Sequence, residues 1–176
     1  GQTEQYGLFQ HSTLCVTAEN EALGLLDIQH FHNDDYDVSK HHDERPIEEK
    51  KTHCWIKALR ATQDLLKDSG KKVITVADRE GDFFEFLHAL TQDKAEYVIR
   101  VKTNRCTGKK TEQGEKLFDC LDVQPSMGKI STCINDANTH EIKKVEFEVK
   151  ALEGIDFPVP RWVKTTNTPD KCKPIT

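Results

Sequence analysis

The order of strand-like and helix-like segments constrains the fold of this chain more than any other feature. Two segments rich in β-forming residues, 8–17 and 23–31, are joined by the short connection ENEA, which predicts an antiparallel hairpin. Apolar periodicity then predicts a helix at about 46–69, a strand at 72–77, a helix at 82–91 and a strand at 96–105. The resulting order, β-β-α-β-α-β, is typical of the α/β class.

Signals at the helix ends support these assignments. Pro46 stands at the start of the first helix, a position that proline favours, and Gly70 is suited to cap its carboxyl end. Asp82 and Glu85 have the spacing of a capping box at the start of the second helix. The apolar face of the first helix is formed by Trp55, Ala58, Leu59, Thr62, Leu65 and Leu66.

The character of the sequence changes after Arg105. Residues 106–140 are rich in Gly, Pro, Ser, Asn and Thr and contain few long apolar runs. The strict alternation in KKVEFEVKAL, 143–152, predicts a half-exposed strand, and RWVKTTN, 161–167, is a further strand candidate. We therefore predict a core at 1–105, followed by a β-rich region at 106–176.

Composition limits the class of protein. The chain is 36% hydrophobic and 31% charged, and it has no apolar run of the roughly 18 residues that a membrane span requires. Its first ten residues do not follow the pattern of a signal peptide. None of the six cysteines forms a C-x-x-C pair, so we expect free thiols in a reducing cytoplasm. The net charge of −5 argues mildly against a nucleic-acid partner, but the charge is unevenly distributed.

The segment 32–45 is polar and is interpreted as a solvated loop. It carries acids ahead of a histidine pair, and a metal site at this place is a less favoured alternative because the segment lacks a fixed geometry. The candidate ligands would be Asp34, Asp35, His41 and His42.

The stretch VITVADREGDFF, 73–84, places acids where a buried strand ends. Asp78 is the first residue after that strand, and in α/β sheets functional groups gather at the carboxyl ends of strands. A helix cap is the structural alternative, but the capping-box spacing gives that role to Asp82. A carboxylate held at a strand end suits Mg²⁺, which needs few protein ligands because it keeps waters and substrate phosphates. Arg79 is placed to neutralise an acid or hold a phosphate, and Gly81 allows a tight turn.

A basic stretch without acids follows. If the strand continues to 105, alternation places Arg100 and Lys102 on one face. Such a cluster beside an acid-bearing strand end suits a phosphate backbone. An edge strand that uses lysines against aggregation is an equally weighted alternative. The basic residues are Arg100, Lys102, Arg105, Lys109 and Lys110.

Four segments of the sequence, in order, resemble one family. VADREGDFFEFL and YVIRVKTNR resemble the core of bacterial DDE transposases of the insertion-sequence-four kind, the cut-and-paste group that includes the Tn-five transposase. YGLFQHSTLCVTAENEALGLLDIQHF resembles the hairpin of that family, with its HSTL and LGLL signatures. RPIEEKKTHCWI resembles the opening of its long helix. The resemblance covers roughly residues 5–105 well and the remainder weakly.

The resemblance implies a ribonuclease-H-like mixed sheet with helices, followed by a β-rich insertion. It implies metal-dependent cleavage and strand transfer at transposon ends, with two Mg²⁺ or Mn²⁺ ions held by two Asp and one Glu. Asp78 is then the second acid of that triad. The resemblance further implies double-stranded DNA as the partner, a homodimer in a synaptic complex and a cytoplasmic, nucleoid-associated location. The implied DNA-contacting residues are Arg79, Arg100, Lys102 and Arg105.

The sequence also departs from the family. We find neither the strand that carries the first Asp nor the helix that carries the Glu, and Lys51 stands where the family more often has an acid. The chain thus looks like the middle of a transposase, and alone it is expected to be inactive because one acid does not assemble a two-ion site. The alternative is a catalytically dead remnant that only binds DNA or dimerises. A different Mg²⁺-dependent phosphotransfer domain is a weaker third interpretation.

Overall fold

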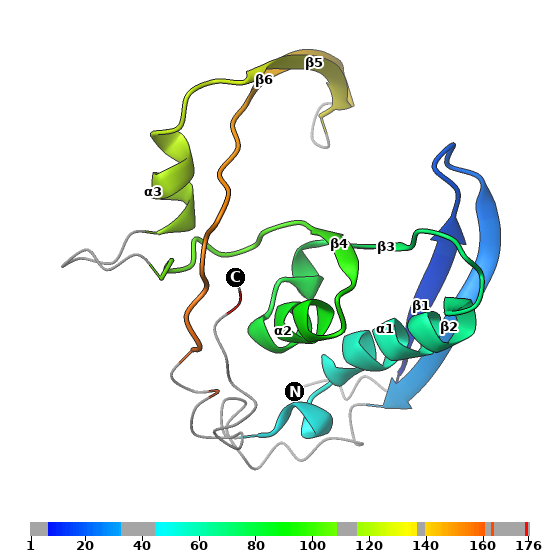
Figure 1. Ribbon diagram of the computed structural model, residues 1–176. Coiled ribbons are helices and arrows are strands. Elements are labelled where there is room, and N and C mark those ends of the chain that lie inside the picture. Colours follow the sequence, from blue (N-terminus) through cyan, green and yellow to red (C-terminus); the bar gives the residue numbers. More distant parts are fainter. Residues whose placement is uncertain are drawn as a thin grey trace, which may run out of the picture. The chain divides into compact units, whose positions relative to one another are not determined.

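The computed structural model describes residues 7–32, 45–108, 116–136 and 140–160, together with Val163 and Ile175. The chain divides into two compact units: Gly1–Lys102 with Val159–Ile175, and Thr103–Pro158 with Thr176. The boundary predicted from the sequence lies after Arg105. The division in the structure falls after Lys102, and it assigns Val159–Ile175 to the first unit. The predicted mixed α/β class is confirmed, and Figure 1 shows its helices and its small sheets.

The first unit begins with the predicted hairpin. Strands β1 (Leu8–Val16) and β2 (Ala22–His32) pair antiparallel in a register that sets Leu8 opposite His32. The turn is closed by the backbone amide of Asn20, which donates to the carbonyl oxygen of Thr17 at 3.0 Å. Asn20 has φ +67°, a left-handed conformation that asparagine tolerates better than most residues. The predicted hairpin is therefore confirmed, and each strand ends within one residue of its predicted bounds.

The first long helix starts later than predicted. A short 3₁₀ turn, η3 (Ile47–Glu49), follows Pro46, and helix α1 occupies His53–Leu66. The chain is extended at Lys50, with φ −103° and ψ 145°, which interrupts helical geometry. This conformation directs the Lys50 side chain inward, where its Nζ lies 3.4 Å from Oε1 of Glu85. A tertiary ion pair therefore overrides the local helix signal at Pro46.

Strand β3 (Ile74–Ala77) leads through the 3₁₀ turn η4 (Arg79–Gly81) into helix α2 (Phe84–Gln92), which returns to strand β4 (Glu96–Ile99). β3 and β4 are parallel and set Ile74 opposite Glu96. Both strands are shorter than predicted. β4 ends at Ile99 because β3 turns away into η4 after Ala77 and leaves later residues without a partner strand.

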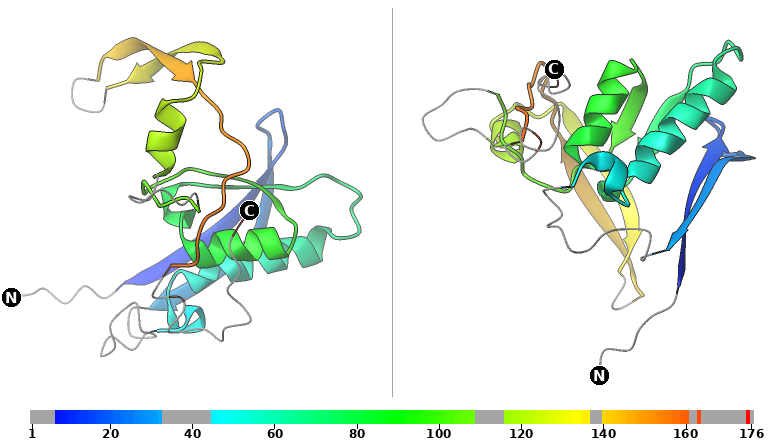
Figure 2. Two further views of the ribbon diagram at one scale, coloured as in Figure 1. Left: turned by 60° about the vertical axis from the view of Figure 1, so that its left-hand side comes forward. Right: turned by 90° about the horizontal axis from the view of Figure 1, so that it is seen from below.

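The core of the first unit lies between its two helices and the hairpin. Phe86 and Leu90 of α2 are 1% and 0% exposed. Trp55 of α1 contacts Phe86, with ring centroids 5.6 Å apart, and also contacts His11 of β1 at 4.8 Å. Figures 1 and 2 show α1 alongside α2 and the hairpin. The other buried apolar side chains described in this unit are those of Ile47, Cys54, Ile56, Ala58, Leu59, Ala77, Phe84, Leu87, Ala89, Val163 and Ile175.

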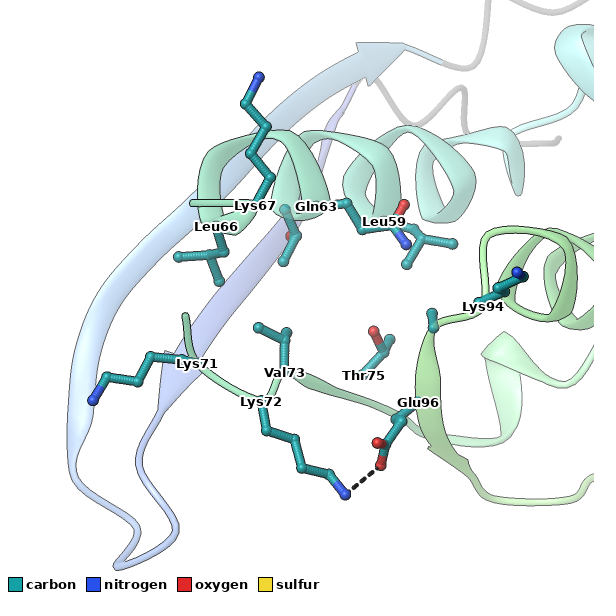
Figure 3. Close-up of a pocket in the computed structure, with 12 residues that line it drawn as sticks. Leu59, Gln63, Leu66, Lys67, Lys71, Lys72, Val73, Thr75, Lys94 and Glu96 are labelled. Carbon is teal, nitrogen blue, oxygen red and sulfur yellow. Dashed lines mark ion pairs between the residues drawn. The ribbon is translucent and has the colours of Figure 1, made fainter. Parts of the chain in front are cut away.

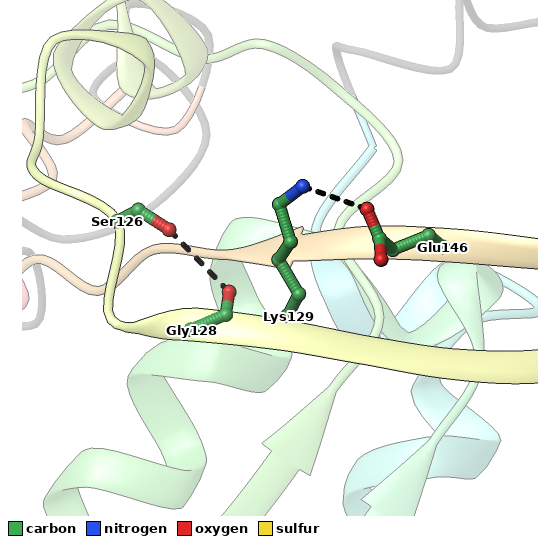
Figure 4. Close-up of polar contacts among 4 residues, drawn as sticks. All are labelled: Ser126, Gly128, Lys129 and Glu146. Atoms are coloured by element: carbon green, nitrogen blue, oxygen red, sulfur yellow. Dashed lines mark hydrogen bonds and ion pairs between the residues drawn. The ribbon is translucent and has the colours of Figure 1, made fainter.

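The second unit contains helix α3 (Leu117–Asp122) and an antiparallel pair, β5 (Gly128–Asn135) and β6 (Ile142–Val149). The strand predicted at 143–152 is thus confirmed as β6. Lys129 Nζ pairs across the strands with Glu146 Oε1 at 2.7 Å, and the Ser126 hydroxyl donates to the Gly128 carbonyl at 3.4 Å (Figure 4). Every residue of β5 is exposed.

Several expectations fall partly or wholly outside the described residues. Apart from Val163, the strand candidate 161–167 is not described, and neither are the possible metal ligands Asp34, Asp35, His41 and His42. Lys109, Lys110 and Cys172 also lie outside. The cysteines at 15, 54, 106, 120 and 133 are free thiols, as expected. Within the described ranges, no helix combines the length and apolar character needed to cross a bilayer.

Candidate metal and nucleic-acid site at the end of β3

Asp78 lies directly after β3, and its side chain is exposed. Its Oδ1 accepts a hydrogen bond from the backbone amide of Glu80 at 2.9 Å, so Asp78 is the N-cap of η4. The expectation that Asp78 lacks a structural role is therefore wrong. The turn between β3 and α2 is itself a short helix, and its free amide groups require an acceptor.

Asp82 does not cap α2, contrary to the capping-box prediction. The N-cap of α2 is Phe83, which makes no side-chain capping hydrogen bond. Oδ2 of Asp82 instead accepts a hydrogen bond from the backbone amide of Lys102 at 2.6 Å. Glu85, the other half of the predicted box, lies against Lys50. Asp82 thus connects the segment after β4 to the turn after β3. Sequence spacing does not predict this contact, because the two residues are 20 positions apart.

Arg100 is brought next to the end of β3 through its backbone. Its amide donates to the carbonyl of Ala77 at 3.1 Å, so Arg100 lies across from the residue that precedes Asp78. Both Arg100 and Lys102 are exposed. The predicted strand face that they were to share does not exist, because β4 ends at Ile99. They are nevertheless anchored at the same end of the parallel pair as Asp78.

Arg79 and Arg105 have different surroundings. Arg79 is exposed in η4, immediately after Asp78. Arg105 belongs to the second unit, where its guanidinium lies 5.2 Å from the centre of the Phe157 ring. This distance is within the range of a cation–π contact. Of the four predicted DNA-contacting residues, the structure therefore brings Arg79, Arg100 and Lys102 to the end of β3.

Asp78 is the predicted metal ligand that the structure places at this strand end. Oδ1 of Asp78 accepts a hydrogen bond from the Glu80 amide, which orients the carboxylate. Within those same ranges, no group of three His, Cys, Asp or Glu side chains is arranged to hold a metal ion. A single exposed carboxylate binds a divalent ion only weakly, and Mg²⁺ would complete its shell with water and phosphate oxygens.

A lysine-rich pocket lies at the opposite end of β3 and was not predicted. Its volume is about 390 Å³, and Lys67, Lys71, Lys72 and Lys94 contribute to its walls. Lys72 Nζ pairs with Oε2 of Glu96 at 2.7 Å, while the side chains of Lys67 and Lys71 point away from each other (Figure 3). The lysines do not converge on one point, so the pocket is not a built anion site.

Comparisons with known proteins do not assign the chain to a family. A scan against protein-family models finds no match to this chain, and a search of curated proteins finds none.

Proposed function

We propose that this chain is part of the catalytic core of a DDE transposase, a metal-dependent enzyme that cleaves and joins DNA strands at transposon ends. The proposal rests on the four motifs in one order, which resemble the insertion-sequence-four family. One structural observation supports it: an exposed carboxylate, Asp78, directly follows β3, and the backbone amide of Arg100 is bonded to the carbonyl of Ala77, the residue before Asp78. The finer fold proposed with it is ribonuclease-H-like.

The chemistry of Asp78 fits a hard cation. A bound Mg²⁺ or Mn²⁺ would activate water and stabilise charge on a phosphodiester. Asp78 would hold the ion through the carboxylate oxygen that the Glu80 amide leaves free. The Glu80 amide fixes the direction of the carboxylate, which lowers the entropic cost of binding. Two further carboxylates are needed for a two-ion site, and the family supplies them from an Asp strand and a Glu helix.

The exposed cations beside Asp78 would position the nucleic acid. Lys and Arg contacts to phosphate fix the register of a duplex without reading its sequence. Arg79, Arg100 and Lys102 lie at the end of β3, whereas Arg105 would bind through the second unit. DNA at transposon ends is the proposed partner, bound by a homodimer in the nucleoid.

Mn²⁺ titration followed by NMR tests the metal role. Paramagnetic Mn²⁺ is expected to broaden amide signals around the end of β3, most strongly at residues 77–80, and Asp78→Asn is expected to abolish this broadening. Asparagine caps helices as well as aspartate does, so the variant keeps η4 intact. Asp68→Asn, at an exposed acid beyond α1, is the matched control and should leave the broadening unchanged. Equal broadening in the Asp78→Asn protein would remove the metal assignment.

DNA binding tests the cationic residues independently. Fluorescence anisotropy with a labelled duplex should show binding that weakens with salt, and a charge-to-alanine change at Arg100 or Lys102 should lower the salt slope by about 1. Lys71→Ala is the control, since Lys71 is an exposed lysine before the other end of β3. The same loss of affinity from all three changes would mean that charge, and not this site, governs binding.

A second candidate is a catalytically dead remnant that only binds DNA or dimerises. The exposed Arg79, Arg100 and Lys102 at the end of β3 would serve such a module equally, because contacts to phosphate need no metal ion. The two experiments separate the candidates. DNA binding that depends on Arg100 and Lys102, without selective Mn²⁺ broadening at residues 77–80, identifies the binding module. Both effects together identify the catalytic core.

A further inference from the structure

Two histidines lie on one exposed face of the β1–β2 hairpin. His30 and His32 are two residues apart in β2, and both are exposed. Gln29, between Ile28 and His30, faces the other way: its side-chain amide donates to the carbonyl of Cys54 in α1 at 2.9 Å. Because successive side chains of a strand point to opposite faces, His30 and His32 lie on the face turned away from α1. Alternate residues of an antiparallel strand are about 6.8 Å apart, so the two imidazole side chains are neighbours.

A short chain of hydrogen bonds fixes the protonation of His30. Gln10 of β1 is directly opposite His30 in the strand register. Nε2 of Gln10 donates to the hydroxyl oxygen of Ser12 at 2.7 Å, and Oε1 of Gln10 lies 3.0 Å from Nε2 of His30. An amide oxygen only accepts, so Nε2 of His30 is the protonated nitrogen. In the neutral ring, Nδ1 then carries the lone pair.

This arrangement is typical of a histidine that binds a metal ion. Such histidines usually donate the N–H of the second ring nitrogen to a carbonyl or carboxylate oxygen, which fixes the tautomer and the direction of the ring. Oε1 of Gln10 is positioned to be that acceptor. His32 offers a second imidazole on the same face. Linking two ligands makes the second bond intramolecular, which raises the affinity by about 10²–10⁴ over one ligand.

The ligand type selects the class of ion. Imidazole nitrogen suits Ni²⁺, Cu²⁺ and Zn²⁺, whereas Mg²⁺ prefers oxygen ligands. Two histidines are fewer than the four ligands of a closed structural zinc site, so water would complete the shell. This agrees with the finding that no three potential ligands converge within the described ranges. The ion would therefore be exposed to solvent and exchangeable.

We propose that His30 and His32 chelate one first-row transition-metal ion on the outer face of the hairpin. Gln10 is the positioning residue: it holds His30 in the tautomer that presents Nδ1 to the ion. The inference is independent of the metal and DNA roles proposed above, because it uses other residues and a softer class of ion than the one that Asp78 suits.

Ni²⁺ titration followed by NMR tests the site. Ni²⁺ is the probe because Cu²⁺ would oxidise the free thiols of the chain. In the untagged protein, with Mg²⁺ in large excess, Ni²⁺ is expected to broaden amide signals most strongly at residues 8–12 and 28–32, and the effect should saturate. Broadening that Mg²⁺ removes, or none at these residues, would overturn the proposal.

Matched histidine variants test the chelate. His32→Gln, at an exposed position, is expected to raise the dissociation constant for Ni²⁺ by about a hundredfold or more. His140→Asn is the control. His140 is exposed, has no histidine within two positions, and has φ +56°, a conformation that asparagine tolerates. An equal effect of the two variants would mean that the two histidines of β2 do not act together.

The adjacent histidines of the polar segment 32–45 are the competing ligands to exclude. The double variant His41→Gln with His42→Gln is expected to leave the broadening at residues 8–12 in place. Loss of that broadening would assign the ion to the polar segment and overturn the chelate in β2.

Variants at Gln10 test the positioning role. Gln10→Leu removes the acceptor and is expected to weaken Ni²⁺ binding by about tenfold, whereas Gln10→Glu should restore it. Nitrogen-15 NMR of the histidine rings should show His30 protonated at Nε2 in the wild type, and a mixture of tautomers in Gln10→Leu. A His30 protonated at Nδ1 in the wild type, or unchanged affinity in Gln10→Leu, would overturn the role of Gln10.

Discussion

The ammonium of Lys50 lies 3.4 Å from the carboxylate of Glu85, and the two side chains are only 2% and 9% exposed. The pair joins the turn before α1 to the first turn of α2. Removing one partner of a buried ion pair leaves an uncompensated charge, whereas replacing both by apolar groups is often tolerated. The geometry of the α1–α2 junction therefore depends on both residues together.

We expect Lys50→Met to lower the free energy of unfolding by about 3–5 kcal/mol, because Glu85 is then buried without its cation. The double variant Lys50→Met with Glu85→Leu should recover most of this loss. Urea denaturation followed by circular dichroism measures both. The single variant Glu85→Leu completes the cycle: a double variant whose loss equals the sum of the two single losses would show that the two side chains are not energetically coupled.

Asp82→Asn should loosen the segment after β4. The hydrogen bond from the Lys102 amide to Oδ2 of Asp82 is 2.6 Å long and has a charged acceptor. Replacing the carboxylate by an amide is expected to cost about 1–2 kcal/mol locally. Hydrogen exchange at the Lys102 amide should become roughly tenfold faster. Glu80→Gln, at an exposed position of η4, is the control and should leave that rate unchanged. The prediction is wrong if both variants exchange alike.

His88 should make the stability depend on pH. Its ring stacks on Phe84 with centroids 5.9 Å apart, and burial lowers its pKa below the ordinary value of 6.5. The unfolded chain then binds a proton at a higher pH than the folded chain does. Lowering the pH from 7.5 through 6.5 therefore favours unfolding.

The variant His88→Phe removes this titration and keeps an aromatic ring against Phe84. Its unfolding free energy should fall less steeply than that of the wild type between about pH 7.5 and 5.5. Thermal melts across this range provide the measurement. The slope will not vanish, because burial also lowers the pKa values of His11 and His53. Identical slopes in the two proteins would contradict the assignment to His88.

The elements that the sequence predicts well are those fixed by local chemistry. The β1–β2 hairpin follows from alternation and a short turn, and α2 follows from its apolar periodicity. The start of α1 and the role of Asp82 were not predictable, because both depend on contacts with residues distant in the sequence, Glu85 and Lys102.

In the candidate site, too, local sequence predicts some features, whereas others depend on distant contacts. The position of Asp78 at a strand end follows from the apolar run before it. Its hydrogen bond to Glu80 was missed, because the 3₁₀ turn between β3 and α2 has no strong sequence signal. Whether Arg100 lies near Asp78 depended on strand pairing, which periodicity does not specify.

Gly81 lies in the turn that follows Asp78, at a place too close to β3 for a larger side chain. A Cβ at Gly81 would lie 2.8 Å from the Cβ of Ala77 and 3.5 Å from the rings of Phe86 and Trp55. Ala77 is fixed in β3 and has no flexible side chain that can move away. Gly81→Ala is therefore expected to displace η4 and to lower the unfolding free energy by about 1–3 kcal/mol.

The displacement should also be visible at the site. Amide chemical shifts of residues 78–80 are expected to change in the Gly81→Ala protein, since η4 must move away from β3. Gly7→Ala is the control: a Cβ there meets nothing within 4 Å, so stability and shifts should be unchanged. Urea denaturation and NMR of both variants test the prediction. Wild-type stability and wild-type shifts in the Gly81→Ala protein would mean that the close approach of η4 to Ala77 does not position Asp78.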